Sequence, residues 1–219
     1  MVAAGSGTRF GGPKQYVELG GRRMVDWALD AARAVCDGVV LVAPPDRDDP
    51  EPDVDHTVVG GPTRSASVRS GLDAVPPEAA VVVVHDAARP LAGPGLFEAV
   101  IAAVESGADA AVPAVPVADT LRRAEGGVVD REGVFAVQTP QAFRAEALRA
   151  AHAEGGDATD DATLVEAAGG RVVIVEGDRR NIKVTDPHDL ELAAALLSSA
   201  FPGHAGRADE RAARRRSAR

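Results

Sequence analysis

The sequence predicts an α/β fold with a Rossmann-like, mostly parallel sheet, flanking helices and a protruding β-arm. The first observation is that short runs rich in valine and alanine alternate with longer amphipathic stretches along the 219 residues. The second is that residues 116–137 break this alternation with short strand signals around a Gly-Gly turn. With 45% hydrophobic residues, the chain can fill the core of one domain of ordinary to large size.

The individual elements follow from the positions of the runs and of the turn residues. Strands are expected at residues 38–43, 56–60, 80–85, 110–115 and 171–176. Helices are expected at residues 24–36, 64–74, 94–105, 141–153, 160–168 and 187–199. Thr139-Pro140 and Asp186-Pro187 have the form of a helix cap followed by proline at the first helical position. Gly169-Gly170 is expected to end a helix.

The domain organisation predicted from these elements is simple. Residues 1–201 form a single domain, from which the arm at about 116–137 extends. The arm has too few apolar residues for a core of its own and is therefore expected on a partner subunit. Residues 202–219 are polar and basic and are expected to be a disordered tail. Only Met1 and Val2 precede the first glycine-rich loop, so the strand that normally leads into such a loop is expected to be absent.

Composition excludes several classes of function. A net charge of −9, a pI near 5.0 and 3% aromatic residues argue against a nucleic-acid or anionic-membrane binder. No apolar run approaches the length of a membrane span. Cys36 is the one cysteine, so no disulfide can form within the chain. We expect a cytoplasmic protein.

The opening loop, "AAGSGTRFGGPKQY" at residues 3–16, has the composition of a phosphate-binding loop. It fits neither the P-loop pattern nor the dinucleotide fingerprint, because Phe10 stands at the third glycine position of the latter. It does fit GxGTR followed by PK, a pattern of nucleotidylyltransferases. Lys14 and Lys183 are the only lysines in a chain with 24 Lys and Arg residues, which indicates a need for a compact ammonium.

Three further segments carry candidate chemistry. In "VVVVHDAARP", Asp86 follows a valine strand at the edge where ligands bind in open α/β sheets, with Arg89 three residues on. "RRNIKVTDPHDL" delivers Lys183 just before a capped helix, and "GDATDDATLVE" places Thr159 at a helix start. His85 is expected to have a structural role.

Taken in order, these segments resemble the 2-C-methyl-D-erythritol 4-phosphate cytidylyltransferase family of the non-mevalonate isoprenoid pathway. The resemblance runs from residue 1 to about residue 200 and is carried by the segments "AAGSGTRFGGPKQY", "GGPTRSASVRSGL", "VHDAARP", "VADTLRRA", "VDREGVFAVQTPQAF", "ATDDATLVE" and "EGDRRNIKVT". It implies a nucleotide-diphospho-sugar transferase fold and the transfer of CMP from CTP to the sugar-alcohol phosphate with release of pyrophosphate. It also implies a requirement for Mg²⁺ or another divalent cation, and a homodimer clasped by the β-arms.

The resemblance assigns site residues position by position. The catalytic group comprises Arg9, Lys14, Asp86 and Lys183, with Asp86 also near the metal. The CTP-binding group comprises Ala3, Ala4, Gly5, Gly7, Gly60, Arg64 and Ser67. The acceptor-binding group comprises Arg89 and Thr159, together with Thr120 and Arg131 on the arm, which match residues that reach the neighbouring subunit's site.

Two departures and three alternatives remain at this point. The departures are the missing first strand and Pro62, which stands where many relatives have an acidic or polar residue beside the base pocket. The nearest alternative is a ribitol 5-phosphate cytidylyltransferase, whose motifs overlap heavily. The others are a nucleotidylyltransferase that uses another nucleoside triphosphate, and a nucleotide-binding regulator without catalysis.

Overall fold

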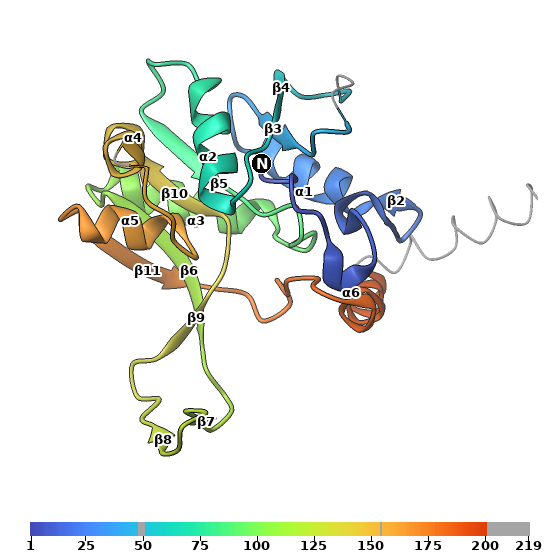
Figure 1. The fold of residues 1–219 in the computed structure, drawn as a ribbon, viewed down its shortest axis with the longest axis vertical. Helices are drawn as coiled ribbons and strands as arrows, with labels where there is room; N and C mark the ends of the chain where they lie inside the picture. The colour runs from blue at the N-terminus through green and yellow to red at the C-terminus, as the bar shows by residue number, and fades with distance from the viewer. Residues whose placement is uncertain (48–50, 154, 201–219) are drawn as a thin grey trace, which may run out of the picture.

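The computed structural model describes residues 1–47, 51–153 and 155–200, apart from the side chains of residues 9 and 200. A layered body carries one long arm that projects away from it (Figure 1). The predicted basic tail, residues 202–219, lies outside the described residues.

The sheet at the centre of the body is mostly parallel, as predicted. Its longer strands are β3 (Val40–Ala43), β4 (His56–Val59), β5 (Val81–Val84), β6 (Ala110–Pro116), β10 (Gln141–Arg144) and β11 (Val172–Glu176). Strand β3 pairs with β4 in parallel, and β11 pairs with β6 in parallel. Strand β10 lies between β5 and β6 and is antiparallel to both. The strands β5, β6 and β11 therefore run in one direction, with β10 as the reversed member.

Residues Met1 to Ala3 occupy the place of the first strand, so the expectation that this strand is absent is wrong. On one side, Val42 donates its N–H to the Met1 carbonyl (2.9 Å) and Ala3 donates to Val42 (2.8 Å). On the other side, Val2 donates to the His85 carbonyl (2.8 Å) and accepts from Ala87 (3.0 Å). These residues bridge β3 to β5 in parallel register, so the two parts of the sheet form one continuous layer.

Helices cover both faces of this layer. They are α1 (Met24–Arg33), α2 (Arg64–Asp73), α3 (Pro94–Glu105), α4 (Ala145–Ala153), α5 (Asp161–Ala167) and α6 (Pro187–Ala200). Side chains alternate along β5, so Val82 and Val84 pack with α2, α4 and α5, whereas Val81 and Val83 pack with α3. Both faces are apolar, as expected for strands buried between two helical layers.

The segment after Thr139 corrects one prediction. Residues 141–144 form β10 rather than the first turn of a helix, and α4 begins at Ala145. The peptide bond between Thr139 and Pro140 is cis, and Thr139 caps no helix. Gln141 to Phe143 are buried in register with neighbouring strands, so tertiary pairing overrides the local cap-and-proline signal. The other signals are confirmed: α6 begins at Pro187, and Gly169 follows α5 with a positive φ of 84°.

The arm is confirmed as a β-hairpin extension. After β6, the chain forms β7 (Leu121–Arg122) and β8 (Val128–Val129), which pair around Gly126-Gly127, and returns as β9 (Phe135–Val137) along β6. Figure 1 shows β7 and β8 at the tip, far from the helices. Val128, Phe135 and Val137 are exposed on this arm.

The smaller elements complete the body. The 3₁₀ turns η1 (Thr8–Phe10) and η2 (Lys14–Tyr16) and the short strands β1 (Glu18–Leu19) and β2 (Arg22–Arg23) precede α1. Within the described residues, no helix has both the length and the apolar character that a membrane span requires.

Candidate active site

The opening loop leaves the sheet at Ala3 and folds tightly over itself. Gly7 has a φ of 62°, and a Cβ added to it would lie 1.8 Å from the Gly12 carbonyl oxygen, so this position accommodates only glycine. The buried side chain of Gln15 donates to the carbonyls of Ala3 and Gly5 and ties the end of the loop to its start. The loop geometry is thereby fixed from both ends.

The first part of this loop is suited to an anion. Within the described part of the chain, the N–H groups of Gly5, Ser6 and Gly7 donate to no backbone acceptor. Gly5 and Ser6 are exposed and Gly7 is half-buried, so a ligand can approach this turn of the loop. Lys14 follows in η2, partly buried. Arg9 lies in η1, and its side chain is outside the described part of the structure.

Close packing brings the loop against the N-terminus of α2. A Cβ on Gly60 would lie 2.2 Å from the Ala4 Cβ and 2.9 Å from the Ser67 Oγ, so glycine is needed for this approach. Ser67 is buried and donates from its Oγ to the Thr63 carbonyl (3.0 Å). Four predicted CTP contacts, Ala3, Ala4, Gly60 and Ser67, therefore belong to one wall. Pro62 is exposed at the edge of this wall.

Asp86 forms the centre of the site, directly after β5 and beside Val2. Its Oδ2 accepts from the Lys183 Nζ at 2.6 Å and its Oδ1 from the Arg64 Nε at 3.3 Å. Arg64 is 22 residues from Asp86 in the sequence and Lys183 is 97 residues away, so folding brings these two cations to the carboxylate. The Lys183 side chain is 42% exposed, so its ammonium remains accessible to a ligand.

Electrostatics keep this carboxylate ionised. Burial alone would raise the pKa of Asp86, but Arg64 and Lys183 outweigh burial and hold the pKa well below its ordinary value. Arg64 is likewise kept charged: burial alone would lower its pKa, but Asp86 and Asp161 outweigh burial and raise the pKa. The site therefore offers two fixed cations around one fixed anion.

A chain of hydrogen bonds orients the backbone that carries Asp86. The Asp86 N–H donates to the Thr139 Oγ1 (3.0 Å), which lies 3.0 Å from the His85 Nδ1. The His85 Nε2 lies 3.2 Å from the Arg89 carbonyl, which can only accept, so the proton is on Nε2 and Thr139 donates to Nδ1. Burial lowers the pKa of His85 to about 3, which keeps this imidazole neutral. The predicted structural role of His85 agrees with this geometry.

Arg89 is held by backbone groups rather than by acids. Its Nη1 donates to the Asn181 carbonyl (2.8 Å) and its Nη2 to the Val137 carbonyl (3.2 Å). Its Nε is buried and, among the described residues, has no hydrogen-bond partner. Burial lowers the pKa of Arg89. A guanidinium held in this way at the edge of the sheet is suited to an anionic ligand group.

The acceptor-side residues fall into two groups. Thr159 is exposed in the segment just before α5, whose N-cap Asp160 accepts from the Thr163 N–H (3.0 Å). Thr120 and Arg131 are exposed on the arm, and Arg131 donates to the Ala118 carbonyl there. The arm points away from the body, so a single chain does not bring these two residues to Asp86 (Figure 1).

Several residues that the motifs did not single out support this site. Gln15 closes the loop, Thr139 orients Asp86, and Asn181 donates to the Thr139 carbonyl (2.9 Å). Asp161 and His152 form a buried pair behind Arg64. Most of these residues stand inside or beside the recognised motifs, but their partners are distant in sequence, so local spacing gave no signal of their roles.

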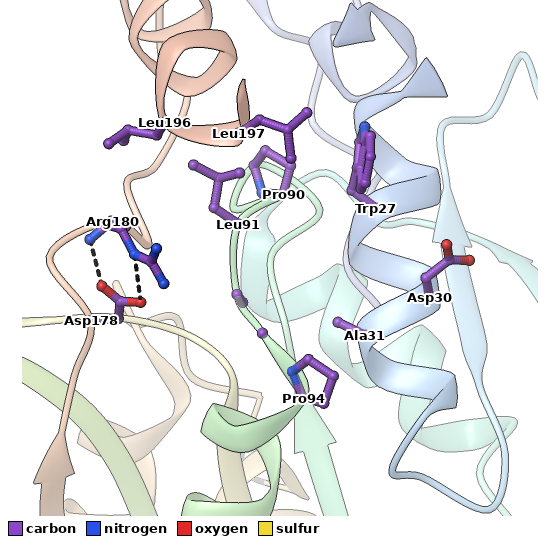
Figure 2. A pocket seen from close by; sticks show the side chains of 12 residues that line it. Trp27, Asp30, Ala31, Pro90, Leu91, Pro94, Asp178, Arg180, Leu196 and Leu197 are labelled. Carbon is purple, nitrogen blue, oxygen red and sulfur yellow. Dashed lines mark hydrogen bonds and ion pairs between the residues drawn. The ribbon is translucent and has the colours of Figure 1, made fainter. Parts of the chain in front are cut away.

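A separate cleft of about 330 Å³ opens between α1, α6 and the segment after Arg89 (Figure 2). Trp27, Leu91 and Leu197 face it, and Asp178 and Arg180 pair at its edge (3.5 Å). None of the predicted site residues lines it. This cleft is mainly apolar and lacks the fixed charges that surround Asp86.

Comparisons with known proteins agree with the motifs. The model of the 2-C-methyl-D-erythritol 4-phosphate cytidylyltransferase family matches residues 1–199. The protein of this name from Deinococcus radiodurans is 48% identical over an alignment of 205 positions, gaps included, which covers 90% of this chain and 87% of that protein. The one from Streptomyces coelicolor is 45% identical over an alignment of 226 positions, gaps included, which covers 90% of this chain and 83% of that protein.

Solved structures give the same result. The crystal structure of 2-C-methyl-D-erythritol 4-phosphate cytidylyltransferase from Thermus thermophilus has 41% sequence identity and a TM-score of 0.79, and the match covers 89% of this chain and 96% of that one. This chain therefore has a glycine loop, a wall at α2 and an Asp86–Lys183 pair at one edge of the sheet. It is also similar to members of this family over most of its length. The chain belongs to the 2-C-methyl-D-erythritol 4-phosphate cytidylyltransferase family.

Proposed function

We propose that the protein transfers CMP from CTP to 2-C-methyl-D-erythritol 4-phosphate, forming 4-diphosphocytidyl-2-C-methyl-D-erythritol and pyrophosphate. The observation that carries this function is the placement of Asp86, Lys183 and Arg64 beside the glycine loop. It joins an anion-binding loop to fixed cations at one edge of the sheet. Family membership supplies the identity of the two substrates.

The reaction is an in-line substitution at phosphorus. An oxygen of the acceptor phosphate forms a bond to the α-phosphorus of CTP, and the bond from that phosphorus to the oxygen bridging it to the β-phosphate breaks. The acceptor phosphate is largely dianionic at neutral pH, since its second pKa is about 6, so no strong base is needed. The barrier comes mainly from crowding of negative charge, which fixed cations and positioning lower.

Each cation has a place in this reaction. The N–H groups of Gly5 to Gly7 receive the triphosphate, and Arg9 and Lys14 stabilise the charge that moves onto departing pyrophosphate. Lys183 holds the α-phosphate from the side of Asp86. Arg89 and Thr159 hold the acceptor phosphate. No side chain acts as a nucleophile, so the protein works by holding charges in place.

Mg²⁺ fits the residues present, and we include it in the proposal. Asp86 is ionised, and within the described residues Oδ1 accepts from Arg64 and Oδ2 from Lys183; a carboxylate oxygen has a second lone pair that can bind a metal ion. Mg²⁺ is commonly held by one or two carboxylates together with substrate phosphates and water. Asp86 would hold it with the triphosphate oxygens, and the ion would supply neutralisation of the phosphate charge.

A homodimer completes the proposal. The arm carries exposed apolar side chains at Val128, Phe135 and Val137, which favour burial against a second copy. In such a dimer, Thr120 and Arg131 would reach the partner's site. Cytoplasmic location and the lack of nucleic-acid or membrane partners stay predictions from the composition.

Competition among nucleotides tests the function. With 2-C-methyl-D-erythritol 4-phosphate as acceptor, we expect CTP to give pyrophosphate and the cytidylyl product, and UTP and ATP to give little of either. Equal use of UTP or ATP would contradict the assignment to CTP. Tight binding of CTP without product would instead indicate a nucleotide-binding regulator.

A further inference from the structure

The start of α2 and the segment before α5 are joined by a series of side-chain contacts. The Thr63 Oγ1 donates to Asp157 (2.7 Å), and the Ser65 Oγ accepts from the Ala158 N–H (3.2 Å). In the proposed function, the start of α2 belongs to the nucleotide wall and the segment before α5 holds the acceptor. The two binding walls are therefore in direct contact.

Arg64 makes the most buried of these contacts. Its Nη1 donates to the Asp161 Oδ2 at 2.7 Å, while its Nε reaches the Asp86 Oδ1 at 3.3 Å. The Asp161 side chain is 0% exposed, and its other oxygen lies 3.0 Å from the His152 Nε2. The guanidinium is thus held at two points by two carboxylates on different elements.

Burial indicates that this pair does more than stabilise the fold. A buried ion pair is often no more stabilising than apolar residues of the same volume, because both charges lose their hydration. What the pair does provide is orientation, since a planar guanidinium bound through both its Nε and its Nη1 cannot rotate freely. The Arg64 Nε, whose direction is fixed in this way, contacts Asp86 at the centre of the site.

We propose that Asp161, supported by His152, is a positioning residue that fixes the orientation of Arg64 toward Asp86 and couples the nucleotide wall to the acceptor wall. This inference rests on the proposed function for the identity of the two walls. Asp161 acts through Arg64 and is not itself expected to touch a substrate.

Arg149 offers a matched control, because it also joins α2 to a neighbouring helix. Arg149 of α4 donates to the carbonyls of Leu72, Val75 and Pro76 at 3.0–3.2 Å, and so joins α4 to the end of α2 remote from the site. Arg149→Met removes contacts between helices without removing any contact to Arg64 or Asp86. This variant therefore shows how losing contacts between helices, by itself, changes stability and activity.

The experiment compares Asp161→Asn, Arg64→Gln, the double variant and Arg149→Met in the full chain. For each we would measure kcat, KM for each substrate, CTP affinity by calorimetry, and Tm. We expect Asp161→Asn to lower kcat/KM for CTP about ten-fold or more, the scale of one hydrogen bond to a charged group. Arg149→Met should lower Tm while leaving kcat and KM unchanged.

The double variant gives the decisive comparison. If Asp161 acts through Arg64, kcat/KM in the double variant equals that of Arg64→Gln. Losses that multiply would overturn the proposal, as would an Asp161→Asn enzyme that matches Arg149→Met. If Asp161→Asn does not fold, Arg64→Lys takes its place. A single ammonium then replaces the guanidinium that contacts both Asp86 and Asp161. We then expect Arg64→Lys to show the ten-fold loss, and wild-type kinetics would overturn the proposal.

Failure of the proposed function would be visible separately. In that case the wild-type protein itself releases no pyrophosphate with CTP and 2-C-methyl-D-erythritol 4-phosphate. The calorimetric comparison of CTP affinity among the same variants still tests the role of Asp161, because it requires no turnover.

Discussion

At the scale of single residues, the site is a balance of charges around Asp86. This carboxylate is buried, yet Lys183 and Arg64 keep it ionised. Asp86 and Lys183 could be predicted from the sequence because each follows or precedes a clear element boundary. The partnership of Arg64 with Asp161 could not, because the two residues are 97 positions apart and only tertiary packing brings the start of α2 to the start of α5.

Lys14→Arg tests whether charge alone is sufficient in the opening loop. The substitution keeps the positive charge but replaces a compact ammonium by a wider planar group. We expect kcat to fall about 10²-fold, the scale of losing one transition-state donor. Steady-state pyrophosphate release measures this, and a kcat near that of the wild type would show that the shape of the cation is unimportant.

His85 gives a pH dependence with a defined sign. Burial lowers its pKa from 6.5 to about 3, so between these values the unfolded chain binds more protons than the folded one. Stability contributed by neutral His85 is therefore present above pH 6.5 and lost as the pH falls. Between about pH 7 and pH 5 we expect a loss of about 2 kcal/mol in the free energy of unfolding.

His85→Gln is the control for this dependence, since glutamine does not titrate in the same range. Urea unfolding of both proteins at the same two pH values provides the measurement. The wild type should lose about 2 kcal/mol more than the variant over this interval. Equal losses would show that His85 is not buried as a neutral group.

At the scale of elements, most helices and strands followed from the sequence, but β10 and the pairing of residues Met1 to Ala3 did not. The valine runs gave the parallel strands because strands buried on both faces are continuous apolar runs. The error at β10 arose because Thr139-Pro140 has the form of a helix start, while pairing with β5 and β6 decides the outcome. Residues Met1 to Ala3 are too few for a strand signal, and only their pairing on both sides reveals their role.

The opening loop provides a test at this scale. Gly7→Ala would place a Cβ 1.8 Å from the Gly12 carbonyl oxygen in a backbone with φ of 62°. The loop must then open, so we expect KM for CTP to rise about ten-fold or more as oriented N–H donors are lost. The matched change is Gly12→Ala, whose Cβ meets no atom within 4 Å and whose effect should be small. An equal rise in both variants would mean that the tight turn at Gly7 is not required.

At the scale of the whole molecule, the arm separates two predicted site residues from the rest. Thr120 and Arg131 are exposed on an extension that leaves the body (Figure 1). The sequence predicted the arm from its weak apolar content and its Gly126-Gly127 turn. Its partner surface could not be predicted, because apolar spacing within one chain does not identify what lies opposite.

Mixing two inactive variants tests whether the arm serves a partner's site. Arg131→Ala and Lys14→Ala each remove one component, and in a dimer these components would come from different chains. Random mixing gives heterodimers in about half of the assemblies, each with one complete site, so about a quarter of wild-type activity should return. Mixtures that stay as inactive as the separate variants would show that each chain forms its site alone.

The proposed function is tested most directly by pyrophosphate release by the full chain with CTP and Mg²⁺, comparing 2-C-methyl-D-erythritol 4-phosphate with ribitol 5-phosphate as acceptor. Release with the first acceptor and little with the second is the predicted result. Preferential release with ribitol 5-phosphate would contradict the assignment of the acceptor. Absence of release with both would contradict the claim that the charges around Asp86 form a working cytidylyltransferase site.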